Sequence, residues 1–213
     1  MIKVEALPLP DDLEPGLFLK DAVKLQLTLD ARLQELSLKA LQREVNNWDA
    51  KKGVAIVMDV NNGEILVLAS TPSYDPNMFS KTLNDSSWEK IINSPNAPLI
   101  NRSINGLYPP GSTFKPVVAL AALQNGLISS RDTIHCNGTY VLGNRKFHCW
   151  KKNGHGHLNL SDAIAQSCDV FFYDLALRLG IEKISETAKL LGFGQYYDEY
   201  YGIPKSIVPN KKW

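Results

Sequence analysis

Long apolar segments and a strong excess of either charge are both missing from this chain of 213 residues. No apolar run reaches the roughly 18 residues that a membrane-spanning helix needs, and the N-terminal residues lack the apolar centre of a signal peptide. The formal net charge is only +1, which gives no electrostatic reason to expect nucleic acid or an anionic membrane as the main partner. We therefore expect a soluble chain, with any anchor of its parent protein lying outside it.

Cysteine is scarce and its number is odd: Cys136, Cys149 and Cys168. Three thiols cannot all pair in disulfides, so the alternatives are free thiols, one bridge with a thiol left over, or metal ligands. His155 lies between the second and third cysteines, and three cysteines with one histidine form a known ligand set of structural zinc sites. The spacing is not that of a standard zinc finger, and His157 is a rival ligand only two residues away. In an oxidising compartment a disulfide is the alternative to zinc.

Hydrophobic periodicity places strands and helices in separate parts of the chain, which indicates the α+β class. Residues 1–20 are rich in proline and acid and have no period, so we expect a linker there. About three strands are predicted, one over 24–29 and two in a hairpin over 53–70 with a turn at Asn61, Asn62 and Gly63. Helices are predicted over 31–46, 86–93, 112–124, 162–167, 169–180 and 181–192. Their expected N-caps include Asp30, Ser161 and Asp169.

Ser112 and Lys115 form a Ser-x-x-Lys pair within the segment YPPGSTFKPVVAL. Residues three apart share one face of a helix, with Cβ atoms about 5–6 Å apart. Pro116 is tolerated in the first helical turn, so it fixes the start of the helix and puts Ser112 at its N-terminal mouth. The pair could be a nucleophile and its base. Alternatively, Ser112 only caps the helix and Lys115 is a solvated surface residue.

Ser167 and Asp169 form a second polar pair at a break between two predicted helices. A hydroxyl and a carboxyl group on a short turn could meet the Ser112–Lys115 pair from another element. The alternative is that Asp169 does no more than cap the helix that follows it.

The segments YPPGSTFKP and SCDVFFY together resemble the transpeptidase domain of class B penicillin-binding proteins, whose three signatures include Ser-x-x-Lys and a Ser-x-Asn motif. The segments LTLDARLQ, STPSYDPN and PLINRSINGLYPPGSTFKP resemble the elongation-specific branch, penicillin-binding protein 2. The resemblance implies an α+β fold of the serine transpeptidase/β-lactamase type, with helices packed on an antiparallel sheet. It also implies a linker from the non-catalytic pedestal over 1–20 and a partial transpeptidase domain over 21–213.

The activity implied by the resemblance is that of a peptidoglycan D,D-transpeptidase, which cross-links stem peptides through an acyl-serine intermediate during cell elongation. Ser112 would be the nucleophile that a stem peptide ending in D-Ala-D-Ala, or a β-lactam, acylates. Lys115 would be the general base, and Ser167 would relay a proton between Lys115 and the leaving amine. Asp169 stands where the wider family has Asn, and it would bind or orient the substrate.

The third signature of the family, Lys-Ser/Thr-Gly, does not follow Asp169 anywhere in the sequence. In the family this strand binds the substrate carboxylate and supplies one oxyanion-hole N–H. Losing one such donor typically costs about 10²–10³ in rate. The interpretation is a C-terminally truncated domain that is weakly active or inactive by itself.

The resemblance also favours a structural zinc ion on Cys136, Cys149, His155 and Cys168, and it implies no organic cofactor. Other implied partners are β-lactams and a glycosyltransferase of the elongation machinery. The parent protein would lie on the periplasmic, extracytoplasmic face of the inner membrane, with this chain as a soluble fragment of it. Two alternatives stay open: a D,D-carboxypeptidase or β-lactamase on the same fold, and a non-catalytic, zinc-stapled module that docks partners.

Overall fold

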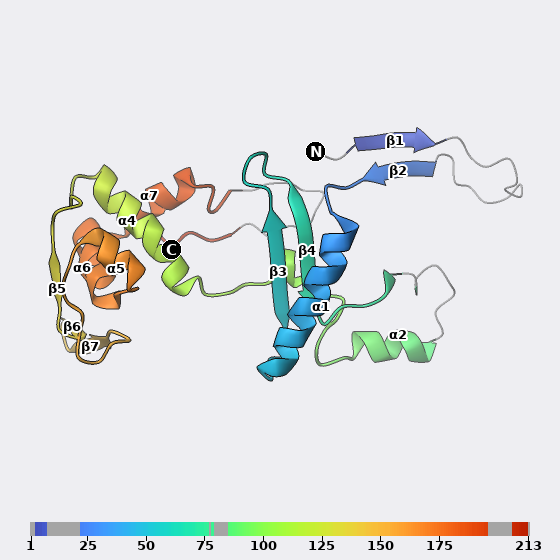
Figure 1. Cartoon of the computed structure of the whole chain (residues 1–213), viewed down its shortest axis with the longest axis horizontal. Coiled ribbons are helices and arrows are strands. Elements are labelled where there is room, and N and C mark those ends of the chain that lie inside the picture. Colours follow the sequence, from blue (N-terminus) through green and yellow to red (C-terminus); the bar gives the residue numbers. More distant parts are fainter. Residues whose placement is uncertain (1–2, 8–21, 77, 79–84, 196–205, 213) are drawn as a thin grey trace, which may run out of the picture. The chain divides into compact units, whose positions relative to one another are not determined.

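The computed structural model describes residues 3–7, 22–76, 78, 85–195 and 206–212 (Figure 1). Its contacts divide the chain into two compact units, Met1–Leu107 and Tyr108–Trp213. Each sheet in the described residues is a two-stranded antiparallel pair, and helices are present in both units. The predicted α+β class is therefore confirmed. Among the described residues, no helix has the length and apolar character needed to cross a membrane.

Within its described residues, the first unit has four strands and three α-helices. They are β1 (Lys3–Leu7), β2 (Ala22–Gln26), α1 (Ala31–Asn47), β3 (Gly53–Met58), β4 (Ile65–Thr71), α2 (Asp85–Ile92) and α3 (Arg102–Asn105). The helices predicted over 31–46 and 86–93 and the hairpin over 53–70 are all present. The predicted linker contains β1, which pairs with β2, while residues 8–20 lie outside the described residues. Its connection to a pedestal stays a prediction.

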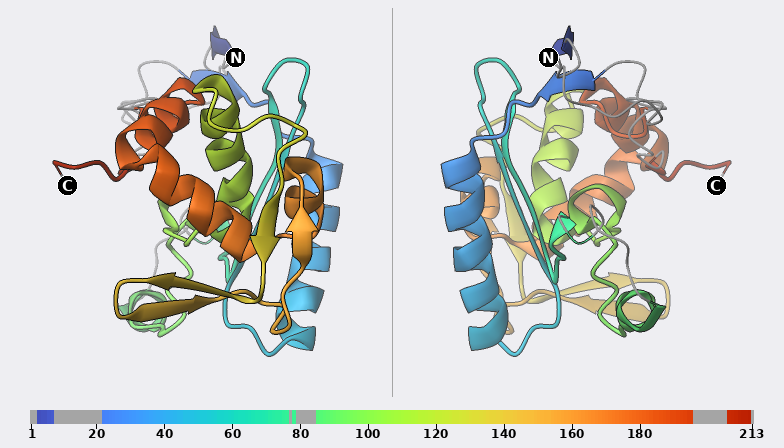
Figure 2. Two further views of the ribbon diagram at one scale, coloured as in Figure 1. Left: turned by 90° about the vertical axis from the view of Figure 1, so that its left-hand side faces the viewer. Right: turned by 90° about the vertical axis from the view of Figure 1, so that its right-hand side faces the viewer.

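Helix α1 lies along the β3–β4 hairpin of the first unit (Figure 2). Asp30 caps the helix as predicted, accepting a hydrogen bond from the Leu33 N–H at 2.8 Å. Gln34 donates to the Leu68 carbonyl at 3.0 Å and accepts from the Leu68 N–H at 2.8 Å. These bonds tie α1 to the edge of β4, whose Val67 and Ala69 are buried.

The second unit carries every predicted site residue. Its elements are the 3-10 turn η2 (Gly111–Phe114), α4 (Lys115–Gln124), β5 (Ile134–Cys136), β6 (Thr139–Leu142), β7 (Arg145–His148), β8 (Gly156–Leu158), α5 (Leu160–Ala165), α6 (Asp169–Leu179) and α7 (Ile181–Leu190). Strand β5 pairs with β8, and β6 pairs with β7. These four strands were missed because each has only three or four residues, too few for a clear alternation.

Two predicted helix caps of this unit are wrong. Helix α5 begins at Leu160 because the side chain of Asn159, rather than that of Ser161, accepts a hydrogen bond from the Asp162 N–H at 2.9 Å. Helix α6 begins at Asp169 itself, with Cys168 as an N-cap that makes no side-chain capping bond. The Asp169 carboxylate is therefore available for other partners.

The core of the second unit lies among α4, α6 and α7. Phe171 and Leu175 of α6 are fully buried, and Ala121 and Ala122 of α4 and Ala188 of α7 are buried with no exposed surface. Small side chains on α4 and α7 leave room for the large side chains of α6. This packing fixes the spacing of α4 and α6, the two helices that carry Lys115 and Asp169.

We expect Leu175→Ala to destabilise the second unit far more than Leu190→Ala. Leu175 is 0% exposed and Leu190 is 79% exposed, so only the first substitution leaves a cavity. The expected cost is about 2–5 kcal/mol for Leu175→Ala and under about 0.5 kcal/mol for Leu190→Ala. Urea denaturation of the two variants measures this difference, and equal midpoints would contradict the assigned core.

Candidate functional site

The first two predicted site residues lie at the start of α4. Ser112 is exposed in the η2 turn, and Lys115 begins α4 one turn later. Pro116 occupies the first turn of α4, as predicted. The Lys115 side chain is only 12% exposed, and its ammonium group lies 5.7 Å from the centre of the Phe172 ring. The alternative of a solvated surface lysine is therefore wrong.

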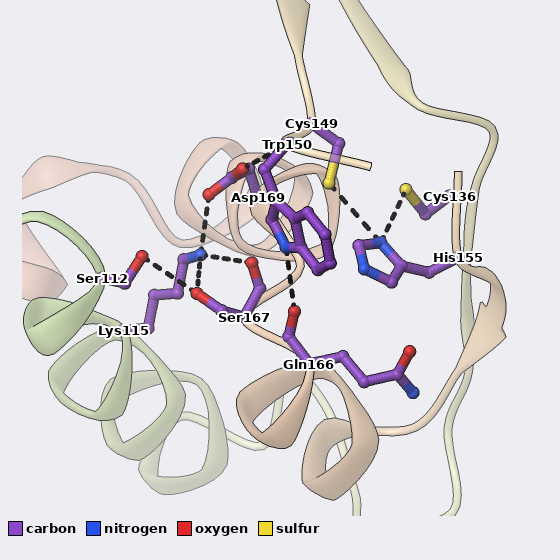
Figure 3. A network of polar contacts seen from close by, with 9 residues as sticks. All are labelled: Ser112, Lys115, Cys136, Cys149, Trp150, His155, Gln166, Ser167 and Asp169. Carbon is purple, nitrogen blue, oxygen red and sulfur yellow. Dashed lines mark hydrogen bonds and ion pairs between the residues drawn. The ribbon is translucent and has the colours of Figure 1, made fainter. Parts of the chain in front are cut away.

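Lys115 joins the two predicted polar pairs into one network (Figure 3). Its Nζ donates to the Ser167 carbonyl at 2.8 Å, to Ser167 Oγ at 2.9 Å and to Asp169 Oδ1 at 2.7 Å. Ser167 Oγ in turn donates to Ser112 Oγ at 3.0 Å. An ammonium group has three donors, so each can be matched with one of these acceptors. All four predicted residues thus lie in one hydrogen-bonded network.

The turn between α5 and α6 holds Ser167 in an uncommon conformation. Its φ is +50°, in the left-handed region that costs a residue with a side chain roughly 1–2 kcal/mol. The Ser167 N–H donates to the Ile164 carbonyl at 3.1 Å, and the Cys168 N–H donates to the Ala163 carbonyl at 2.9 Å. In this conformation both the carbonyl and the hydroxyl of Ser167 accept from Lys115.

Asp169 links this network to the segment that follows Cys149. Its Oδ1 accepts from Lys115, while its Oδ2 accepts from the backbone N–H of Trp150 at 3.1 Å. The Trp150 indole Nε1–H donates to the Gln166 carbonyl at 3.0 Å. Both ends of the turn that carries Ser167 are therefore bonded to Trp150.

The four predicted metal ligands form a second cluster beside this network. One ligand atom from each of Cys136, Cys149, His155 and Cys168 lies within 4.8 Å of all the others. His155 Nδ1 lies 3.6 Å from Cys136 Sγ and 3.5 Å from Cys149 Sγ. All three cysteines are buried, and none is paired in a disulfide. The group could hold a metal ion.

The structure separates the two rival histidines. His155 faces the sulfur atoms, whereas His157 pairs across the β5–β8 ribbon with His135, at 4.6 Å between ring centres. His135 and His157 are both exposed. Side chains alternate between the faces of a strand, so His135 points away from the side of β5 where Cys136 is buried. His157 is therefore outside the cluster.

The lowered pKa values of Cys149 and His155 favour metal binding, whereas the raised pKa of Cys168 opposes it. Burial raises the pKa of the Cys149 thiol, but backbone N–H groups, that of Lys151 first, outweigh burial and bring the pKa below its usual value. Burial raises the pKa of Cys168 to about 12, so a metal ion has to displace its proton on binding. Burial, aided by the Lys151 charge, lowers the pKa of His155, which favours the neutral imidazole that a metal binds.

Two glycines let the backbone cross itself beside the cluster. A Cβ on Gly154 would lie 2.2 Å from the Cys136 carbonyl oxygen, and one on Gly138 would lie 2.1 Å from the Lys152 carbonyl oxygen. Their φ angles, +75° and +93°, also favour glycine. This close approach brings the segment after Cys136 against the segment after Cys149.

Sequence reasoning missed Gly138, Gly154, Trp150 and Gln166. Both glycines follow asparagine, and this Asn-Gly signal of a turn could have indicated them. Nothing comparable marks Trp150, because its contacts are with residues far away in the sequence.

Comparison with known proteins identifies the family. The sequence profile of the penicillin binding protein transpeptidase domain matches residues 53–213. The chain belongs to this transpeptidase family. It is 38% identical to the peptidoglycan D,D-transpeptidase MrdA of Escherichia coli over 190 residues, which are 88% of this chain and 29% of that protein. It is 31% identical to the stage V sporulation protein D of Bacillus subtilis over 88% of this chain and 27% of that protein.

Solved structures of this transpeptidase family share the fold. The chain matches Pseudomonas aeruginosa PBP2 in complex with WCK 5153 with a TM-score of 0.78 and 36% identity, over 88% of this chain and 42% of that one. It matches Helicobacter pylori PBP2 with a TM-score of 0.73 and 36% identity, over 90% of this chain and 36% of that one. The predicted transpeptidase fold is confirmed, and the chain spans under a third of the length of the curated relatives it matches.

We expect Gly154→Ala to destabilise the second unit more than Gly143→Ala. Both glycines have positive φ, at +75° and +57°, but a Cβ on Gly143 would meet nothing within 4 Å. A positive φ costs alanine a similar amount at both positions, so this cost cancels when the two variants are compared. The remaining difference in the free energy of unfolding, about 1–3 kcal/mol, is the cost of forcing the Gly154 segment away from the Cys136 segment. Thermal or urea unfolding of both variants measures this excess, and equal stabilities would contradict the close crossing beside Cys136.

Proposed function

We propose that this chain carries the acyl-serine chemistry of a peptidoglycan D,D-transpeptidase, with Ser112 as the nucleophile. The observation that carries the proposal is the hydrogen-bonded path from Lys115 through Ser167 to Ser112. A serine hydroxyl is a weak nucleophile until a neighbouring group removes its proton. Once Lys115 is neutral, the Ser167 hydroxyl can accept that proton within hydrogen-bond distance of Ser112, because a hydroxyl can both donate and accept.

In the proposed first step, Ser112 Oγ attacks the carbonyl carbon of the penultimate D-Ala of a stem peptide. Lys115 first gives one proton to solvent. The Ser167 hydroxyl then accepts the Ser112 proton and passes its own proton to the neutral amine of Lys115, which reverses the donor order of the network in the structure. A new ester bond forms and the bond to the terminal D-Ala breaks. The departing amine takes a proton from Lys115 through Ser167, whose hydroxyl can both donate and accept. The amine of a second stem peptide then attacks the ester carbonyl and gives a proton to Lys115. The ester bond to Ser112 breaks, Ser112 takes a proton back along the path, and the new amide bond completes the cross-link.

Asp169 has an orienting role in this proposal. Its carboxylate accepts from Lys115 and from the Trp150 N–H, so it holds the ammonium group beside Ser167. A charge-assisted bond of this kind is stronger than one between neutral groups. Asp169 thus fixes the position of the base without itself exchanging a proton with the substrate.

The alternatives have less support. A D,D-carboxypeptidase or a β-lactamase would use the same nucleophile and deliver the acyl group to water, but the names of the relatives favour transpeptidation. A module that only docks partners would not need a largely buried lysine bonded to two serine oxygens and a carboxylate.

We propose zinc as the metal of the Cys3His cluster. Zn–S bonds of about 2.3 Å and Zn–N bonds of about 2.0–2.1 Å around a tetrahedral ion place sulfur and nitrogen about 3.6 Å apart. The two sulfur–nitrogen distances here are 3.6 and 3.5 Å, so these two pairs have the spacing of zinc ligands, and all four ligand atoms lie within 4.8 Å of one another. Four protein ligands leave no open position, and a bound zinc would be structural. It would tie β5 and the Cys149 segment to Cys168, which lies between Ser167 and Asp169.

The wider setting is also a proposal. The Helicobacter pylori PBP2 has been solved in a complex with MreC, and another relative, 28% identical, belongs to a peptidoglycan synthase complex that coordinates polymerization and crosslinking. We infer a glycosyltransferase of the elongation machinery as partner of the parent protein. Its place would be the periplasmic face of the inner membrane, where stem peptides are available, and β-lactams would acylate the same serine.

We expect penicillin to acylate Ser112. The mass of the chain should rise by one penicilloyl group, slowly because the sequence has no Lys-Ser/Thr-Gly strand. Continuing the chain with the corresponding C-terminal residues of the Escherichia coli relative should speed the reaction by about 10²–10³. Intact-mass measurements over time give both rates, and peptide mapping locates the adduct. Slow loss of the adduct favours the transpeptidase over a β-lactamase, which would lose it rapidly.

Two variants control this experiment. Ser112→Ala should abolish the adduct, whereas Ser161→Ala, at an exposed serine of α5, should leave it unchanged. The proposed function is wrong if neither form of the wild-type protein is acylated, or if the adduct survives Ser112→Ala.

We expect one zinc ion per chain in the native mass, lost on denaturation. His155→Ala should remove it, because His155 faces the sulfur atoms, and Cys168→Ser should do the same. His157→Ala should retain the ion, because His157 lies outside the cluster. A mass lower by two hydrogen atoms in both states would instead indicate a disulfide, and zinc bound equally by all variants would refute the ligand assignment.

A further inference from the structure

The turn that carries Ser167 is held at both ends by one residue. Trp150 donates its indole N–H to the Gln166 carbonyl at 3.0 Å and its backbone N–H to Asp169 Oδ2 at 3.1 Å. Gln166 and Asp169 flank Ser167 and Cys168 in the chain. Figure 3 shows the indole ring between Asp169 and His155, directly beside this turn.

The indole bond satisfies a group at the end of a helix. Helix α5 ends at Ala165, and Gln166 is its C-cap. The last carbonyl groups of a helix have no partner within it and need one from elsewhere. The Trp150 N–H provides a partner for the Gln166 carbonyl, immediately before Ser167.

Packing alone does not explain Trp150. The residue is 64% exposed, although burial is where a large aromatic side chain stabilises a fold most. The polar N–H of the indole nevertheless points to the backbone of the turn, at the Gln166 carbonyl. A role in holding that backbone accounts for this orientation, whereas a role in filling the core does not.

The position of Ser167 depends on this turn. With φ at +50°, its hydroxyl lies between Lys115 and Ser112. Strained conformations persist only where surrounding contacts determine them. If the Gln166 carbonyl loses its donor, the turn can relax and the hydroxyl can leave the path between the base and the nucleophile.

Trp150 also connects the turn to the Cys3His cluster. It follows Cys149 in the chain, and its ring contacts the His155 ring edge-on at 5.3 Å between centres. Fixing Cys149 and His155 therefore restricts both the backbone and the ring of Trp150. Trp150 is therefore a second connection between the cluster and the turn, in addition to Cys168, which belongs to both.

We propose that Trp150 is a positioning residue for the acylation of Ser112. Its indole N–H holds the Gln166 carbonyl and thereby keeps the Ser167 hydroxyl between Lys115 and Ser112. The inference rests on the proposed function, and it adds a residue that touches neither the nucleophile nor the base.

The test replaces the indole N–H while keeping an aromatic ring at this position. Trp150→Phe and a benzothienylalanine at position 150, in which sulfur takes the place of N–H, both leave the ring beside His155 and the backbone bond to Asp169. Trp48→Phe is the matched control, because Trp48 is exposed and lies in the first unit. Each variant is measured in two forms: the chain of 213 residues, and the same chain continued with the C-terminal residues of the Escherichia coli relative.

Three measurements separate positioning from a structural role. Amide hydrogen exchange at Ser167 and Cys168, whose N–H groups are bonded in the turn, should be about five- to tenfold faster in both Trp150 variants. The acylation rate constant at saturating penicillin should fall by a similar factor, the equivalent of one neutral hydrogen bond. The half-saturating penicillin concentration and the zinc content should not change, and Trp48→Phe should behave as wild type.

The outcomes decide between the two proposals. Unchanged exchange at Ser167 and Cys168 overturns the inference, whatever the acylation rate. Faster exchange with an unchanged acylation rate also overturns it, because the turn is then held by Trp150 without serving the reaction. A third outcome is faster exchange in the Trp150 variants with no acylation of either form of the wild-type protein. It refutes the proposed function, while the assignment of Trp150 to the turn stands.

Discussion

The bonds of the Lys115 ammonium group join two helices that are distant in the sequence. Lys115 begins α4, and its three acceptors all belong to the turn and first residue of α6. The group is largely buried, and a buried charge is costly unless it is paired and hydrogen-bonded. The packing of α4 against α6, the conformation of Ser167 and the placement of the Asp169 carboxylate all serve to satisfy this one cation. The same arrangement places a hydroxyl against Ser112.

The Cys3His cluster lies beside the network around Lys115 and shares the turn between α5 and α6 with it. Short strands cannot hold a loop of this length by themselves, and β5 to β8 offer only three or four residues each. Three thiols and one imidazole from these segments lie close together and add contacts that the short strands lack. Cys168 is one residue from both Ser167 and Asp169, so order imposed on the cluster is transmitted directly to the groups around Lys115. A structural ion in this position would thus have a catalytic consequence without touching a substrate.

The predictable parts of the site are those set by local spacing. Ser112 and Lys115 are three residues apart, so helical geometry alone puts them on one face, and Pro116 marks where the helix begins. The ligand types of the cluster follow from composition, but the choice of His155 over His157 depends on strand pairing that the sequence does not reveal. The φ of Ser167, the crossing at Gly154 and the contacts of Trp150 arise from residues brought together only by folding. The cap at Asn159 was missed because Ser161 is an equally good cap by residue type.

The aspartate at position 169, where the Ser-x-Asn motif of the family resemblance has Asn, suits this network. Two donors face the side chain from different directions, the Lys115 ammonium and the Trp150 N–H, and each takes one carboxylate oxygen. An asparagine offers only one oxygen, and its NH₂ group would face one of these donors. One of the two bonds would then be lost, and two donors would oppose each other in a half-buried site. The carboxylate is therefore the group that allows one side chain to hold both the base and the Trp150 segment.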